Sequence, residues 1–195
     1  MRRLMCVPMM TLCLLLSGCG GQEETEDLRL PYREMSGCTM TATVTCEQAG
    51  AEWEALLRCD YVPEGECTVE VLEPEIIAGV KASFTDGKLR LEYGETELNA
   101  GTLSVREVSP VLCLAELMSA LRDGWLLEEN DEAWQEIPCR RILLDQTGAG
   151  GEKIVSAVWL KTEGGTPLRG EISVGGEIIL TAEFTEFEFH DIINR

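Results

Sequence analysis

The stretch that decides the fold is SPVLCLAELMSALRDGW at residues 109–125, the one segment after the N-terminal leader with the pattern of a long helix. Ser109 can cap the N-terminus with its hydroxyl, and Pro110 suits the first helical position, where no N–H is needed. Arg122 suits the last turn, and Gly124 can take the left-handed conformation that ends a helix. The sequence therefore predicts one long helix between Ser109 and Trp125.

This predicted helix is apolar on nearly all sides. Leu114, Leu117, Met118 and Leu121 follow the i, i+3, i+4, i+7 rule, and Glu116 is the only charge before the last turn. Such a helix must be covered on several sides. About 14 residues at ~1.5 Å each are too short to span a bilayer. The rest of the chain must therefore cover it.

Most of the remaining chain alternates apolar and polar residues with period two, as half-buried strands do. Asp86-Gly87 is a strong hairpin signal between two such runs. The acidic residues 128–132 read as a loop, and residues 28–36 as either a short helix or an extended lead-in. The predicted strands cover residues 38–46, 53–61, 67–71, 80–84, 89–93, 96–98, 102–105, 139–144, 154–160, 168–174 and 178–189.

An antiparallel meander with a single apolar helix predicts an α+β fold that is mainly antiparallel β. We expect a curved meander sheet, an open half-barrel, wrapped around the long helix.

The N-terminus has the pattern of a bacterial lipoprotein signal. Arg2 and Arg3 precede an apolar run from residue 4 to 16, and Leu16-Ser17-Gly18-Cys19 follows. The alternative is an ordinary secretory signal with a chance cysteine. We predict that residues 1–18 are a signal peptide and that Cys19 is lipidated. Residues 19–33 then form a flexible acidic tether, and residues 34–195 a single domain.

The charge of the chain narrows its partners. The net charge is −19, and the leader holds two arginines and no acid, so its removal makes the chain still more negative. This acidity argues against nucleic acid as a partner and against lying flat on anionic lipid. We expect a cell-membrane protein that a lipid anchor holds on the extracytoplasmic side.

Six cysteines follow Cys19: Cys38, Cys46, Cys59, Cys67, Cys113 and Cys139. Four of them fall at inward positions of successive predicted strands, where a buried thiol behaves as a small hydrophobe. A disulfide is the alternative. If the first hairpin has a four-residue loop at residues 47–50, Cys38 lies opposite Cys59 and the two could bridge.

No chemistry of catalysis or metal binding is evident. The cysteine spacings match no zinc pattern, and His190 is the only histidine. The chain has no Gly-x-Ser-x-Gly elbow, no His-Glu-x-x-His motif and no phosphate loop. We therefore expect no enzyme, no metal and no cofactor.

Several stretches together resemble the LolA/LolB-like superfamily of lipoprotein carriers and receptors, in the form of a Gram-positive surface lipoprotein. They are the lipobox, the strand-turn-strand opening at 39–60, VEVLEPEIIAGV at 69–80, GGTPL at 164–168 and FTEFEF at 184–189. The resemblance covers about residues 34–190. It implies an open half-barrel closed by helices around an apolar cavity for acyl chains, in proteins that carry lipoproteins or glycolipids or sense envelope stress.

Two functions remain open. The first is binding or sensing of an acyl or lipid ligand in a cavity between sheet and helix. The candidate lining residues are Met40, Val44, Trp53, Leu57, Leu114, Leu117, Met118, Leu121 and Trp125. The second is a surface module with a filled core that binds an envelope protein through an exposed face or a sheet edge. Because Cys19 would anchor the chain permanently, receipt or sensing of a lipid fits better than free shuttling.

Overall fold

The computed structural model describes residues 27–48, 51–102, 109–147 and 151–190. The predicted signal peptide, Cys19 and most of the predicted tether lie outside the described residues. Most of the strand predicted at 102–105 lies outside them as well.

The described chain forms one antiparallel sheet of eleven strands with two helices. The helices are α1 (Leu30–Glu34) and α2 (Cys113–Asp123). The strands are β1 (Cys38–Gln48), β2 (Ala51–Tyr61), β3 (Cys67–Glu73), β4 (Lys81–Thr85), β5 (Lys88–Tyr93), β6 (Thr96–Thr102), β7 (Trp125–Trp134), β8 (Ile137–Asp145), β9 (Ile154–Lys161), β10 (Pro167–Val174) and β11 (Glu177–Phe189).

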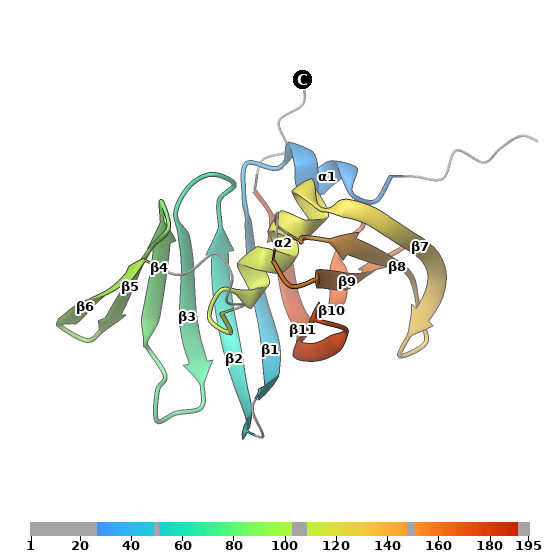
Figure 1. The fold of residues 1–195 in the computed structure, drawn as a ribbon. Helices are drawn as coiled ribbons and strands as arrows, with labels where there is room; N and C mark the ends of the chain where they lie inside the picture. The colour runs from blue at the N-terminus through green and yellow to red at the C-terminus, as the bar shows by residue number, and fades with distance from the viewer. Residues whose placement is uncertain (1–26, 49–50, 103–108, 148–150, 191–195) are drawn as a thin grey trace, which may run out of the picture.

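The strand order shows that the sheet consists of two meanders joined in the middle. It runs β6-β5-β4-β3-β2-β1-β11-β10-β9-β8-β7, so β1 pairs with β11 and the two edges are β6 and β7. The first meander runs outward to one edge, and the second starts at the other edge and runs back to the centre. The sheet is open, because its two edge strands β6 and β7 do not pair with each other. It is also curved (Figure 1).

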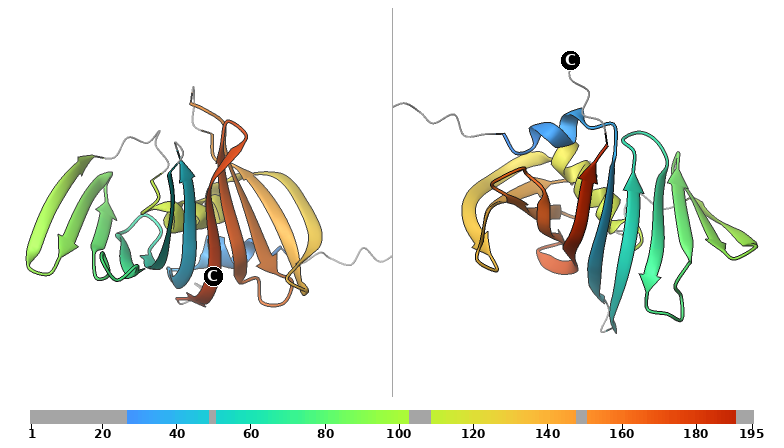
Figure 2. Two further views of the ribbon diagram at one scale, coloured as in Figure 1. Left: turned by 90° about the horizontal axis from the view of Figure 1, so that it is seen from below. Right: turned by 180° about the vertical axis from the view of Figure 1, so that it is seen from behind.

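The helix α2 lies in the connection between the two edges. It crosses one face of the sheet, and β7–β10 curl toward that face (Figures 1 and 2). We call this face the concave face. The predicted mainly antiparallel, open, curved sheet is thus confirmed in outline, with two meanders in place of one.

The predicted long apolar helix is wrong in its length. The helix α2 has 11 residues and begins at Cys113, with Leu112 at the N-cap position and no side-chain cap. Ser109 starts a separate turn, in which its carbonyl accepts from the N–H of Leu112 at 2.9 Å. Gly124 is extended, with φ −62°, and so does not end the helix in the left-handed conformation.

The acidic stretch 128–132 is part of strand β7, so the predicted loop is wrong. Each residue of β7 before Trp134 is exposed, because the strand is at the sheet edge and pairs only with β8. A strand that is wet on both faces has no hydrophobic alternation to reveal it.

The register of the first hairpin also differs from the prediction. Gln48 pairs with Ala51, so the connection is shorter than the expected four-residue loop. Cys38 consequently lies opposite Tyr61, and Cys59 lies opposite Met40. The register on which a Cys38–Cys59 bridge depended is wrong, and both cysteines are free thiols in the structure.

Candidate functional site

The candidate site is the concave face of the sheet together with α2. The helix packs on β2, β8, β9 and β10, and α1 packs on the helix. Close approach to β10 depends on Gly170: a Cβ there would lie 2.5 Å from Cδ1 of Leu117. The missing side chain therefore makes the room into which Leu117 inserts.

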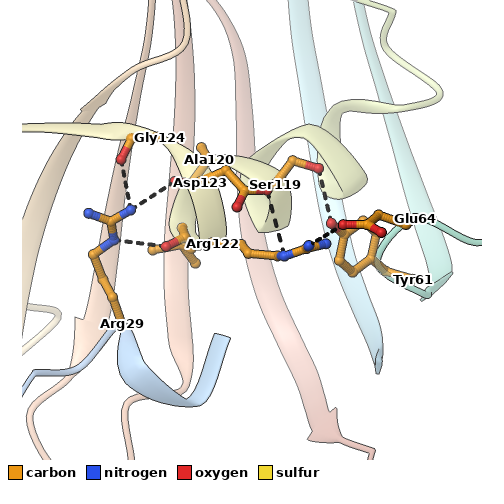
Figure 3. A network of polar contacts seen from close by, with 9 residues as sticks. Arg29, Tyr61, Glu64, Ser119, Ala120, Arg122, Asp123 and Gly124 are labelled. Carbon is orange, nitrogen blue, oxygen red and sulfur yellow. Dashed lines mark hydrogen bonds and ion pairs between the residues drawn. The ribbon is translucent and has the colours of Figure 1, made fainter. Parts of the chain in front are cut away.

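Arg29, which immediately precedes α1, holds the C-terminus of α2 (Figure 3). Its Nε donates to the carbonyl of Leu121 at 2.8 Å, and its Nη2 donates to Gly124 at 2.8 Å and to Ala120 at 3.4 Å. The last carbonyls of a helix have no partner within the helix and carry partial negative charge. The buried guanidinium of Arg29 supplies both the hydrogen-bond donors and the positive charge. The helix can therefore end without a glycine in the left-handed conformation.

A second polar contact fixes the middle of α2 to the end of β2. The hydroxyls of Tyr61 and Ser119 lie 3.1 Å apart, and one turn on, Arg122 forms an ion pair with Glu64 at 2.7 Å (Figure 3). Glu64 belongs to the turn between β2 and β3. The helix is therefore tied to the border between the covered and the uncovered part of the concave face.

The N-terminal half of α2 carries a half-buried carboxyl group, that of Glu116. Burial raises the pKa of Glu116 to about 7, and a hydrogen bond from the backbone of Ser109 lowers it in part. The side chain of Gln146 donates to the carbonyl of Glu116 at 3.0 Å and accepts from Ser156 at 2.5 Å. These contacts fix this end of the helix to the end of β8 and to β9.

The structure brings most of the predicted lining residues together beneath α2. Each of the following exposes 3 % of its surface or less, in one core: Met40, Val44, Leu57, Leu114, Leu117, Met118 and Leu121. Trp53 is half-buried and packs against this core. The prediction for Trp125 is wrong, because α2 ends at Asp123 and Trp125 starts β7 with 76 % of its surface exposed.

The concave face continues beyond α2 over strands β3–β6, which we call the wing (Figure 2). Cys59 in the core pairs with Val69, which continues across the wing to Ala82, Leu91 and Leu98. Directly paired residues share a face, so this row lies on the concave side. The rows beside it are apolar too.

Five of these side chains form what we call the apolar strip: Val71, Phe84, Leu91, Tyr93 and Leu98. Val71, Phe84 and Leu91 are half-buried, whereas Tyr93 and Leu98 expose 57 % and 59 % of their surface. Charged residues such as Lys81, Arg90 and Glu97 alternate with them and so lie on the opposite, convex face. The strip is thus an apolar surface continuous with the core under α2.

Sequence reasoning missed the residues that hold the helix. Arg29 is one arginine far from α2 in sequence, and no pattern marks it. Sequence reasoning also missed a cluster on the convex face, where the Arg169 guanidinium lies 4.4 Å from the Trp134 ring and 5.8 Å from the Trp159 ring. The indole N–H of Trp159 donates a hydrogen bond to Glu132 at 2.9 Å, so this polar group already has a partner within the protein.

The single histidine lies in a surface hydrogen-bond chain. Thr39 Oγ1 donates to Asp60 at 2.7 Å and lies 2.8 Å from Nε2 of His190. Because the hydroxyl proton points to Asp60, the ring is not placed to take that proton as a general base. Within the described ranges, no group of three or more histidine, cysteine or acidic side chains could hold a metal ion.

Comparison with known proteins gives similarity at the level of the fold. No family model matches the sequence, and no curated protein matches it. The structure is similar to that of a LolA superfamily protein from Nitrosomonas europaea, at 10% identity over 85% of this chain and 92% of that chain, with a TM-score of 0.45. It is also similar to LprF from Mycobacterium bovis, at 11% identity over 83% of this chain and 92% of that chain, with a TM-score of 0.45.

A third similar structure is the lipoprotein LppX from Mycobacterium tuberculosis, at 12% identity over 86% of this chain and 95% of that chain, with a TM-score of 0.44. In the part of the chain that the structure describes, no helix has the length and apolar character to cross a membrane.

Proposed function

We propose that the protein is a lipid-anchored extracytoplasmic lipoprotein, of the kind found on Gram-positive surfaces, that binds an acyl ligand on the concave face. Residues 1–18 are removed as a signal peptide, and Cys19 carries the anchor. The ligand lies on the apolar strip beside α2. The observation that carries this proposal is the apolar strip itself, an exposed surface that extends the core.

The packing under α2 favours the wing as the place where the ligand binds. Met40, Leu114, Met118 and Leu121 expose none of their surface, so side chains already fill the space between helix and sheet. An acyl chain in that space would have to displace them. On the wing, by contrast, an acyl chain covers apolar surface that otherwise faces water, and that burial contributes about 25 cal/mol per Å².

Titration of the purified protein with a fluorescent fatty acid tests the proposal. We expect saturable binding by the wild type and a loss of at least about tenfold in affinity for Leu98→Glu, because the charge would be buried under the ligand. Asn99→Asp is the matched control, since the next residue of β6 lies on the convex face. Absence of saturable binding by the wild type, or equal affinities of the two variants, would contradict the proposal.

Membrane fractionation tests the anchor separately. We expect the wild type in the membrane fraction, extracted only by detergent, and Cys19→Ser in the soluble fraction or as an unprocessed precursor. Metabolic labelling with an alkyne fatty acid should mark the wild type and not the variant. Labelling of the variant would assign the lipid to another residue.

The second candidate function, an interaction module for an envelope protein, is favoured by the open sheet. Strand β7 pairs on one side only and is exposed at each residue before Trp134, which offers backbone N–H and C=O groups to another chain. A photoreactive residue at Glu128 should then cross-link a partner in membranes. The same residue at Glu188, on the convex side of β11, serves as the control. Equal cross-linking at both positions would count against a β7 interface.

A further inference from the structure

Two cysteines of neighbouring strands lie side by side on the concave face. Cys59 of β2 and Cys67 of β3 have their Sγ atoms 3.7 Å apart, and the strands are joined by the short turn at residues 62–66. Cys59 pairs with Val69, so Cys67 is its diagonal neighbour on the same face. A disulfide has an S–S distance of about 2.05 Å, so an approach of less than about 2 Å would join the two sulfurs.

This pair differs chemically from the other cysteines. The two sulfurs lie within hydrogen-bonding distance, and either thiol can be the donor. The contact with Cys59 lowers the pKa of Cys67, whereas the contact with Cys67 and burial raise the pKa of Cys59. Burial, in contrast, raises the pKa of Cys38 to about 12. Cys67 also keeps 5 % of its surface exposed while Cys59 exposes none. The thiolate is the nucleophile in disulfide exchange, so Cys67 is the thiol that reacts first.

We propose that Cys59 and Cys67 are a disulfide-forming pair that a disulfide oxidant, small molecule or protein, closes after export. The Cys67 thiolate attacks one sulfur of the oxidant, forms a mixed disulfide and releases the other half as a thiolate. The Cys59 thiol loses its proton and attacks Cys67, which releases the second half. The two cysteines lose two electrons and two protons, and the oxidant is reduced to two thiols.

The bond would connect the two parts of the concave face. Cys59 is in the core beside α2, and Cys67 is in the first strand of the wing, next to Phe84 by its pairing with β4. A bridge between them holds the wing at a fixed angle to the covered half. This inference depends on export only for the oxidising compartment, and not on acyl binding.

Mass spectrometry of the purified full chain tests the pair directly. The protein is incubated with oxidised glutathione, unfolded without reductant, alkylated and cut with trypsin. Cleavage after Arg58 and Lys81 places both cysteines in one peptide, residues 59–81. We expect this peptide unalkylated and lighter than its dithiol form by two hydrogens. Alkylation of both cysteines, or a cross-link from this peptide to residues 34–58, which hold Cys38 and Cys46, would overturn the proposal.

Two variants separate this pair from general thiol reactivity. Cys59→Ser should accumulate a mixed disulfide between Cys67 and glutathione, because the resolving thiol is gone. Cys113→Ser removes another buried cysteine and should leave the link within residues 59–81 unchanged. Absence of glutathione on Cys67 in Cys59→Ser would overturn its assignment as the attacking thiol. A fatty-acid titration of reduced protein reads the proposed function independently of this result.

Discussion

The two halves of the concave face have the same sequence pattern and different fates. Strands β1 and β2 alternate apolar and polar residues, and so do strands β3–β5 of the wing. In the first half α2 covers the apolar side, and leucines there expose almost none of their surface. In the wing burial declines toward the edge: Val69 of β3 exposes 1 % of its surface and Leu89 of β5 exposes 9 %, whereas Leu98 of β6 exposes 59 %. The alternation decides which side chains share a face, whereas the cover over that face decides which part of it becomes core, and that cover is complete beside α2 and is lost toward β6.

Matched leucine truncations in the two halves should give the largest contrast. Leu121→Ala, on the buried side of α2, should lower the free energy of unfolding by about 2–5 kcal/mol, because it leaves a cavity. Leu98→Ala in β6 should change it by less than about 0.5 kcal/mol, because the side chain is mostly in water. Urea unfolding followed by tryptophan fluorescence measures both. Equal losses would show that another part of the chain covers the wing.

Removal of the cation at the end of α2 should give the next largest effect. Arg29→Ala leaves the carbonyls of Leu121 and Gly124 without their charged donor, at a cost of about 2–3 kcal/mol. Arg29→Lys keeps the charge and loses the fork of two donors, so it should recover part of that loss. Urea unfolding of both variants measures this. If Arg29→Lys is no more stable than Arg29→Ala, the stabilisation comes from the geometry of the two guanidinium donors and not from the positive charge.

The half-buried carboxyl of Glu116 on α2 should make the stability of the covered half sensitive to pH. The pKa of Glu116 is raised in the folded state to about 7 from 4.5, so ionisation costs more in the folded than in the unfolded chain. Stability contributed by the protonated group is complete below pH 4.5 and is lost as the pH rises to about 7. Above pH 7, Glu116→Gln should therefore be more stable than the wild type and unfold at a higher temperature. The gain in the free energy of unfolding should be about 1 kcal/mol, because solvent screens the charge.

Melting curves of Glu116→Gln and wild type between pH 4 and pH 8 check this prediction. The stability difference should grow across that window. Glu75→Gln, at an exposed position between β3 and β4, is the control and should follow the wild type. A constant difference for Glu116→Gln across the window would mean that its carboxyl titrates at its ordinary value.

The elements with two distinct faces were the ones that the sequence predicted. Met40 and Val44 in β1, or Ala82 and Phe84 in β4, alternate with polar residues because one face is dry, and the antiparallel sheet follows from that. Strand β7 is exposed on both faces, so its acidic residues show no alternation that would distinguish a strand from a loop. The apolar–polar alternation does not predict the order of the strands in the sheet either. The pairing of β1 with β11 depends on contacts between the two ends of the chain.

The sequence predicts the buried face of α2 better than it predicts where the helix begins and ends. Leu114, Leu117, Met118 and Leu121 all lie in the core, since helical periodicity fixes the face of a helix. Its ends depend on partners elsewhere in the chain. Arg29 takes the last carbonyls and lets Gly124 stay extended, which sends Trp125 into β7. Local sequence signals such as a capping serine or a terminal glycine carry no information about a side chain from another element, such as Arg29, that binds the end of the helix.

The smallest expected effect lies at the border between the two halves. Tyr61→Phe removes the hydroxyl that faces Ser119 at 3.1 Å and keeps the ring in the core. A partly buried neutral hydrogen bond contributes about 0.5–1 kcal/mol, so the loss should be of that size. Ser119→Ala should cost no more than Tyr61→Phe, whose hydroxyl also contacts Arg122. The double variant should cost no more than Tyr61→Phe alone, because that variant already removes the contact between the two hydroxyls. Additive losses in urea unfolding would show that the hydroxyls act separately. The tie between α2 and the wing would then rest on the Arg122–Glu64 ion pair, whose exposed carboxylate makes it weak and sensitive to salt.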